Sequence, residues 1–163
     1  MCLCPVAVNW NLLKLYGRHV NCRNWDMDNP YLFEQVYNVP IAKVWQALSD
    51  RDAMKVWYFP QLIRFEPAVG FHMDFEDDDA TFKKEWVVTQ VVNGKKLAHR
   101  WSYVGYPGTS EVMFELFEVD AGTLLKLTHS GLDSFPLDPH FDRERFEQGW
   151  KSILSINLKR FLR

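Results

Sequence analysis

Cysteine is scarce in this sequence, and the few that occur lie near the amino terminus. Cys2, Cys4 and Cys22 all fall within the first 22 of 163 residues, so no disulfide can cross-link the rest of the chain. An odd number of cysteines at one end is typical of a protein from a reducing compartment, and we predict a cytoplasmic location. Because Cys2 and Cys4 lack further cysteines or histidines at a metal-binding spacing, we expect neither a metal nor another cofactor.

Long apolar runs and an excess of positive charge are also missing. No uninterrupted apolar stretch approaches the roughly 20 residues that span a bilayer. The chain has 19 Lys and Arg against 21 Asp and Glu, a net charge of −2, so it offers no strong positive field to DNA or RNA. We therefore predict a protein that neither spans a membrane nor binds nucleic acid.

Aromatic residues, by contrast, are abundant, at 15% of the chain with 12 Phe and 7 Trp. Large rings supply much area to bury, and a chain of this length suits one domain. Residues 1–28 differ from the rest because they hold every cysteine and present no consistent apolar face. We predict an N-terminal extension over 1–28, with Met27 as a candidate native start, and one domain over 29–163.

The spacing of apolar residues predicts the order of elements. A strand over 31–39 ends at Pro40, which begins a helix over 40–49, and Ser49 or Asp50 caps a second short helix. Period-two alternation then predicts an antiparallel meander, with Asn93-Gly94 as a tight turn. Its strands are expected around residues 69–75, 86–92, 97–103, 112–116 and 125–129.

Near the C-terminus the apolar period changes from two residues to about 3.6, which predicts a long helix. Its apolar stripe is expected to be Phe146, Trp150, Ile153, Asn157 and Phe161. A curved sheet with one apolar face and one long helix pack best with the helix across that face, leaving a space between them. The predicted class is α+β, with about seven strands wrapped around the C-terminal helix and two short helices after the first strand.

Six short segments support a more specific interpretation. They are VPIAKVWQALSD (39–50), KVWY (55–58), PAVG (67–70), LAHRW (97–101), GTLLKLTHSGL (122–132) and GW (149–150). In this order and spacing they resemble the homologues of the activator of heat-shock protein 90 ATPase, a family of the START-like (SRPBCC) superfamily. The resemblance covers roughly residues 31–162 and implies the helix-grip fold. It implies no particular activity, because the shared residues mainly pack and turn the chain.

The inward-facing positions of the meander and the long helix are the candidate ligand-binding residues. They fit both a packed core and the lining of a cavity, with Trp150 as its lid. The family usually has an apolar residue at position 99, so His99 would give the pocket a polar point. The full candidate set is Phe71, Phe75, Trp86, His99, Trp101, Tyr103, Phe114, His129 and Trp150.

Strand register predicts where the two inward histidines lie. We expect His129 next to Val112, Trp101 and Trp86, and His99 beside Val88 and Phe114, so that Phe114 separates the two imidazoles. Such a separation argues against a shared metal ion. His129 then either bonds to the backbone or water as a buried neutral ring, or orients a ligand by a hydrogen bond.

Catalytic patterns are weak throughout the sequence. The carboxylates of residues 74–79 fit a solvated turn better than an acid/base pair, and Ser110, Ser130 and Ser134 lack the sharp turn that presents a nucleophile. An acid/base set could come only from His99, His129 and Tyr103. We therefore expect no catalytic residues.

Three functions are compatible with these observations. The first is noncatalytic binding of an apolar or aromatic small molecule or a lipid in a cavity between sheet and helix. The second, implied by the resemblance, is a co-chaperone-like interaction with a chaperone ATPase of the heat-shock protein 90 type. The third is an enzyme of the cyclase or dehydratase kind. The oligomeric state is left open.

Overall fold

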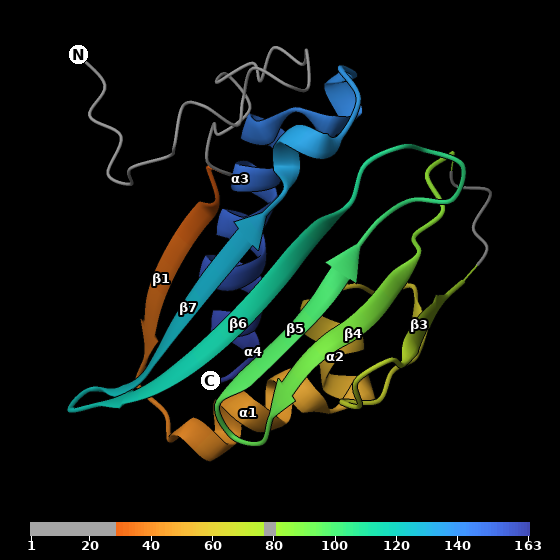
Figure 1. Cartoon of the computed structure of the whole chain (residues 1–163). Helices are drawn as coiled ribbons and strands as arrows, with labels where there is room; N and C mark the ends of the chain where they lie inside the picture. Colours follow the sequence, from red (N-terminus) through yellow and green to blue (C-terminus); the bar gives the residue numbers. More distant parts are fainter. Residues whose placement is uncertain (1–28, 77–80) are drawn as a thin grey trace, which may run out of the picture.

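A curved antiparallel sheet lies over a layer of helices in the computed structural model, which describes residues 29–76 and 81–163 (Figure 1). The predictions for residues 1–28 and for the tip of the acidic turn lie outside the described residues. The elements in chain order are β1 (Tyr31–Tyr37), α1 (Ile41–Ser49), α2 (Arg51–Trp57), β2 (Leu62–Arg64), β3 (His72–Phe75), β4 (Trp86–Val92), β5 (Lys96–Trp101), β6 (Ser110–Val119), β7 (Gly122–Ser130), η3 (Leu132–Ser134), η4 (Pro139–Phe141), α3 (Arg143–Ser152), η5 (Ile153–Leu158) and α4 (Lys159–Phe161).

The seven strands follow the order β1-β7-β6-β5-β4-β3-β2. Strands β2 to β7 form a meander of neighbours, and β1 returns to pair with β7 along its whole length, from Tyr31 opposite His129 to Tyr37 opposite Thr123. The tight turn predicted at Asn93-Gly94 joins β4 to β5, where Gly94 takes a positive φ of 74°. The predicted number of strands and the two short helices after β1 are confirmed.

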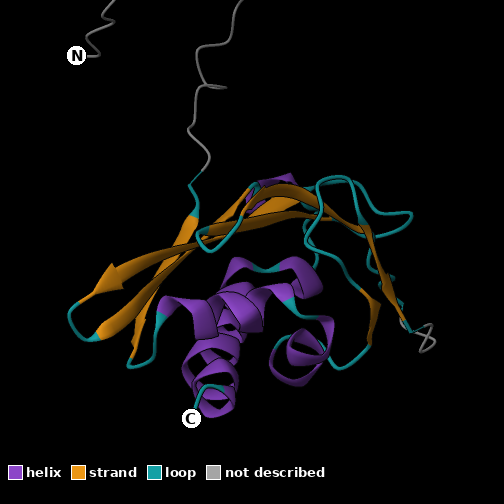
Figure 2. Cartoon of the chain, turned by 90° about the horizontal axis from the view of Figure 1, so that it is seen from below, coloured by secondary structure: helices purple, strands orange, loops and turns teal. Residues whose placement is uncertain are grey.

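Helices α1 and α2 and the terminal helix, from α3 to α4, lie on the concave face of the sheet, as Figure 2 shows from below. The interface is closed by fully buried side chains from both layers, among them Trp57, Leu97, Leu127, Trp150 and Leu154. The prediction that the C-terminal helix covers the apolar face is confirmed. None of the helices in the described part of the chain is long and apolar enough to cross a membrane.

The two short helices begin as their sequences predict. Pro40 precedes α1 with extended backbone angles, and its ring suits this position because no helical N–H is needed there. Asp50, one of the two predicted caps, accepts a hydrogen bond from the Ala53 N–H at 2.8 Å. Ser49 instead donates to the Trp45 carbonyl within α1. The sharp α1–α2 corner thus depends on one aspartate.

One predicted strand is shorter than expected. Val69 was expected to face inward, but its side chain is 67% exposed and β3 begins only at His72. The reason is Gly70, whose φ of 86° breaks the alternation. Backbone bonds still join Gly70 and Phe71 to Val88 of β4, so the chain stays beside the sheet without continuing the strand.

The predicted register between β5 and β6 is wrong by two residues. His99 lies opposite Val112, and Val112 lies opposite His129, so Val112 separates the two histidines and Phe114 does not. Phe114 pairs with Leu97 and Leu127 instead. The connection between β5 and β6 runs over residues 102–109, and a loop of that length does not fix the register as a two-residue turn does.

The buried stripe of the terminal helix also differs from the prediction beyond Trp150. Asn157 and Phe161 are exposed and Ile153 is only partly buried. The side chains that are buried in the structure lie four residues apart. On an α-helix this spacing turns each side chain about 40° around the helix axis relative to the one before it. Residues Ile153–Leu158 form a π-helix, whose wider turn removes much of that rotation. The buried side chains are Phe146, Trp150, Leu154, Leu158 and Leu162.

Candidate functional site

Six of the nine predicted site residues meet in one buried aromatic cluster between the sheet and the terminal helix. Each is at most 6% exposed. The indoles of Trp86 and Trp101 lie 4.1 Å apart by ring centroids, and His99 stacks on Trp86 at 4.8 Å. The six residues, which we call the aromatic cluster, are Trp86, His99, Trp101, Phe114, His129 and Trp150.

Tyr58 occupies the centre of this cluster, and the sequence reasoning did not include it. Its ring stacks on Trp150 at 5.7 Å and contacts Trp86 and Phe114, each at 5.9 Å. Tyr58 follows directly on α2, within a run of three aromatic residues before Pro60. That run is the signal that could have placed it, because three consecutive rings at a helix end cannot all face solvent. Its ring fills much of the expected space between sheet and helix.

His129 belongs to a chain of hydrogen bonds, and its partners determine which of its two ring nitrogens carries the proton. The Trp150 indole N–H can only donate, and it donates to His129 Nδ1 at 3.0 Å. The proton of the neutral ring is therefore on Nε2, which donates to Ser110 Oγ at 2.8 Å. The Ser110 hydroxyl in turn donates to the Trp101 carbonyl at 3.4 Å. His129 thus cannot accept the serine proton in this arrangement, as a catalytic base must.

His99 has the opposite tautomer. Its Nδ1 lies 3.2 Å from the Arg100 carbonyl, which only accepts, so Nδ1 carries the proton. Nε2 then accepts a hydrogen bond from the Tyr58 hydroxyl at 3.0 Å. Both imidazoles are satisfied as neutral rings. His129 is thus a buried neutral ring, but its partners are the side chains of Trp150 and Ser110 and not the backbone or water that we expected.

Burial sets the pKa of these groups. It lowers the pKa of His99 to about 4, although the bond to the Arg100 carbonyl opposes the change. Burial, with smaller contributions from His99 and Arg143, lowers the pKa of His129 to about 3. Burial also raises the pKa of Tyr58 well above its ordinary value. All three groups are uncharged near neutral pH, so the cluster carries no ionised acid or base.

Of the other three predicted residues, Phe75 and Tyr103 lie at the edges of the cluster. Phe75 contacts Trp86 edge-to-face at 4.9 Å, and Tyr103 lies 6.5 Å from Trp101. Phe71 is partly buried, and the Arg64 guanidinium lies 5.8 Å above its ring. The structure therefore brings eight of the nine together, while Phe71 packs separately beside β3.

A cavity of about 220 Å³ opens where β5 ends over the first turns of the terminal helix. Three predicted residues, Trp101, Tyr103 and Trp150, lie in its wall. Gly149 lines it as well, and a Cβ at this position would meet no atom within 4 Å. The remaining lining residues are Phe59, His140, Arg145, Phe146 and Ile153. The rest of the aromatic cluster is packed core beneath this cavity.

Two indole N–H groups of the cluster have no hydrogen-bond partner among the described residues, those of Trp86 and Trp101. Buried donors without a partner are rare in folded proteins. Burial raises the pKa of Tyr103, and the interaction of its hydroxyl with the Trp101 indole opposes that rise. Both indole nitrogens are closed off from solvent, so neither presents its N–H to a molecule in the cavity.

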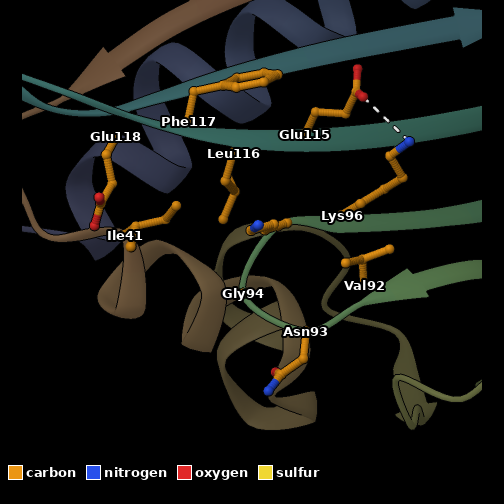
Figure 3. A pocket seen from close by; sticks show the side chains of 10 residues that line it. Ile41, Val92, Asn93, Gly94, Lys96, Glu115, Leu116, Phe117 and Glu118 are labelled. Atoms are coloured by element: carbon orange, nitrogen blue, oxygen red, sulfur yellow. Dashed lines mark ion pairs between the residues drawn. The ribbon is translucent and has the colours of Figure 1, made fainter.

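A larger groove, of about 750 Å³, lies at the other end of β5 (Figure 3). Strand β6 extends past the β4–β5 hairpin, so its last residues have no β5 neighbour. Phe117 lies there with 47% of its side chain exposed, near Ile41 of α1 and the exposed Val92. Lys96 and Glu115 form an ion pair of 3.4 Å at the rim. None of the candidate residues lines this groove.

A metal site is not apparent where the structure can be assessed. No group of three or more His, Cys, Asp or Glu side chains in residues 29–76 and 81–163 is arranged to hold an ion. The two buried histidines lie on opposite sides of Val112 and point their nitrogens at Tyr58, Arg100, Ser110 and Trp150.

A curved seven-stranded sheet gripping a long C-terminal helix through an aromatic cluster defines a START-like protein with the helix-grip fold. Within this class, residues 38–163 match the family described as Activator of Hsp90 ATPase homolog 1-like protein, and the chain belongs to that family. A comparison with curated protein sequences finds no match.

Solved structures confirm the fold. Protein MLL2253 from Mesorhizobium loti has a TM-score of 0.66 at 24% identity, over 82% of this chain and 96% of its own. The Aha1 dimer from Colwellia psychrerythraea has a TM-score of 0.65 at 20% identity, over 82% and 95% of the two chains. CalU16 from Micromonospora echinospora has a TM-score of 0.61 at 22% identity, over 82% and 75%. Identities this low establish the fold alone.

Proposed function

We propose that this protein is a noncatalytic domain that binds a small apolar or aromatic molecule in the 220 Å³ cavity between β5 and the terminal helix. The observation that carries the proposal is a cavity walled by aromatic rings, among them Trp101, Tyr103 and Trp150, and left open at Gly149, where a Cβ would meet no atom within 4 Å. Ligand sites are typically apolar with a few polar groups that fix orientation. An enzymatic function is less well supported, because His99 and His129 are buried, neutral and fully bonded.

The size of the cavity limits the ligand. A cavity of about 150 Å³ suffices for benzene in a protein interior, so about 220 Å³ suits one or two rings or a short branched chain. A lipid would place only part of its chain here. The proposal therefore favours a compact ligand, held by Trp101, Tyr103 and Trp150.

A blocking substitution tests the proposal. Gly149→Leu places a side chain in open space at the cavity wall, and we expect the affinity for ring compounds to fall by at least about tenfold, a change of about 1.4 kcal/mol. Ser152→Leu adds the same side chain at an exposed position of α3 and is the control. Binding is measured by ligand-observed NMR with a library of small aromatic compounds. Equal affinities in both variants, or no binding by the native protein, would refute the proposal.

We infer a second candidate, interaction with a chaperone ATPase of the Hsp90 type, from the family and from the 750 Å³ groove. The groove presents the exposed Phe117 within a rim of mixed charge, a composition that suits a protein surface. A purified chaperone from the same organism is the test. We expect Phe117→Ser to weaken co-purification and any change in ATPase rate, and Leu137→Ser, at a fully exposed loop position, to change neither. A native protein with no effect on the chaperone would contradict this candidate.

A further inference from the structure

The mouth of the 220 Å³ cavity carries an unpaired positive charge. Arg145 lines the cavity, and its side chain is exposed at the opening. No carboxylate forms an ion pair with its guanidinium anywhere in the described part of the chain. Arg143, two residues earlier, pairs with Glu147 at 2.9 Å. The first turn of α3 thus holds one arginine in an ion pair and leaves the other at the cavity.

A second cation, Lys84, packs on rings near this opening. The Lys84 ammonium lies over the rings of Phe59 and Phe75, at 5.4 and 5.3 Å from their centroids. Burial lowers the pKa of His140, another lining residue, and Arg145 and Lys84 lower it further while Asp138 acts in the opposite direction. His140 is therefore neutral near pH 7 and adds no charge to the opening, so Arg145 is the charged side chain that lines this cavity.

The polar groups of the cavity are mostly donors. The Arg145 guanidinium offers several N–H groups in one plane, and the Tyr103 hydroxyl can donate as well. None of the described lining residues is acidic. The remaining wall consists of ring faces and edges from Phe146, Trp150 and their neighbours. Such a wall suits a flat ring, and its donors suit a ligand that carries acceptors.

We propose that the ligand is an aromatic carboxylate, with its ring against Trp101, Phe146 and Trp150 and its carboxylate oxygens accepting hydrogen bonds from Arg145. This inference rests on the proposed cavity function and narrows it to one chemical class. A carboxylate matches the planar guanidinium in two parallel bonds, whereas a neutral alcohol of the same shape makes one weaker bond. The exposed position of Arg145 also lets the anion keep part of its hydration.

The experiment compares three probes that share one ring system. They are 2-naphthoate, neutral 2-naphthalenemethanol and cationic 2-naphthylmethylammonium, each titrated into the full chain by NMR and calorimetry. We expect the carboxylate to bind at least about tenfold more tightly than the alcohol, and the cation to bind most weakly. Raising the ionic strength should reduce the preference for the carboxylate, because the pair lies at the surface.

Two arginine variants test whether Arg145 causes the preference for the carboxylate over the alcohol. Arg145→Gln should bring the affinity for 2-naphthoate down to that for the alcohol and leave the alcohol unchanged. Arg160→Gln, at an exposed position of α4, is the matched control and should change neither affinity. Equal affinities of the native protein for acid and alcohol would overturn the charge inference and leave the cavity function standing. Failure of all three probes to bind would overturn both, and a preference that survives in Arg145→Gln would remove Arg145 from the site.

Discussion

Trp150 connects the packing of the core to its hydrogen bonding. It is 1% exposed, stacks on Tyr58 and donates to His129. Its location could be predicted because the apolar stripe and the family segment both include it. Its bond to His129 could not, since strand register does not say which helix residue reaches a given position of the sheet. Which polar atoms meet in a core depends on register and rotamer, and apolar periodicity reports neither.

The first prediction concerns the stability that Trp150 provides. Trp150→Ala should lower the free energy of unfolding by about 3 to 5 kcal/mol, because a large ring leaves a cavity that the sheet cannot refill. Trp150→Phe should cost about 1 to 3 kcal/mol, since His129 Nδ1 then lacks its buried donor. Urea titrations measure both, and Trp45→Phe at a partly exposed position is the control. A loss below about 0.5 kcal/mol for the alanine variant would contradict the placement of the helix.

The second prediction concerns pH and the two buried histidines. Their pKa values of about 4 and about 3 in the folded protein lie below the ordinary 6.5. At pH values between these folded-state pKa values and 6.5, the unfolded chain binds protons that the folded chain does not. The free energy of unfolding should therefore fall as the pH drops below 6.5. Each histidine contributes up to about 1.4 kcal/mol per pH unit. Above pH 6.5 neither histidine should contribute to the slope.

Urea titrations between pH 7.5 and 5 test this dependence. His129→Gln and His99→Gln should each reduce the slope by a similar amount, and His140, whose pKa burial also lowers, accounts for part of what is left. Equal slopes in the native protein and in the double variant of His99 and His129 would mean that other groups cause the pH dependence.

At the scale of elements, the terminal helix shows where periodicity succeeds and where it fails. The stripe is correct as far as Trp150, where the backbone is α-helical, and shifts by one residue from Ile153, where the π-helix begins. A pattern search that assumes 3.6 residues per turn cannot detect a local change of that period. The Tyr37 hydroxyl donates to the Leu154 carbonyl inside this segment at 2.9 Å, so β1 supports the widened turn.

A pair of neighbouring substitutions distinguishes the two stripes. Leu158→Ala should cost about 2 to 5 kcal/mol, because Leu158 is fully buried beneath the sheet. Asn157→Ala should change the free energy of unfolding by less than about 0.5 kcal/mol, because Asn157 is exposed. Both values come from guanidinium chloride titrations monitored by circular dichroism. A larger loss for Asn157→Ala than for Leu158→Ala would mean that Asn157 is the buried residue, as the regular α-helical stripe predicts.

At the scale of the whole molecule, both ends of the described chain complete one core. Strand β1 pairs with β7, and the terminal helix closes the concave face of the same sheet (Figures 1 and 2). This arrangement could be predicted because every layer has one apolar face and no alternative cover. The small cavity could not, because its volume depends on how far Tyr58 and its neighbours fill the space.

The shared core predicts a single unfolding transition. Urea curves followed by tryptophan fluorescence and by far-ultraviolet circular dichroism should have the same midpoint. Tyr37→Phe should lower that midpoint for both signals together, with a loss of about 1 kcal/mol from the bond between β1 and the terminal helix. Two separate midpoints would show that sheet and helix unfold independently.

The chain of bonds from Trp150 through His129 to Ser110 also has a consequence for exchange with solvent. The indole proton of Trp150 is both buried and bonded. In deuterium oxide it should therefore be replaced only when the helix leaves the sheet altogether, at the slow rate set by global opening. One proton resonance in the NMR spectrum thus records how often the whole domain comes apart.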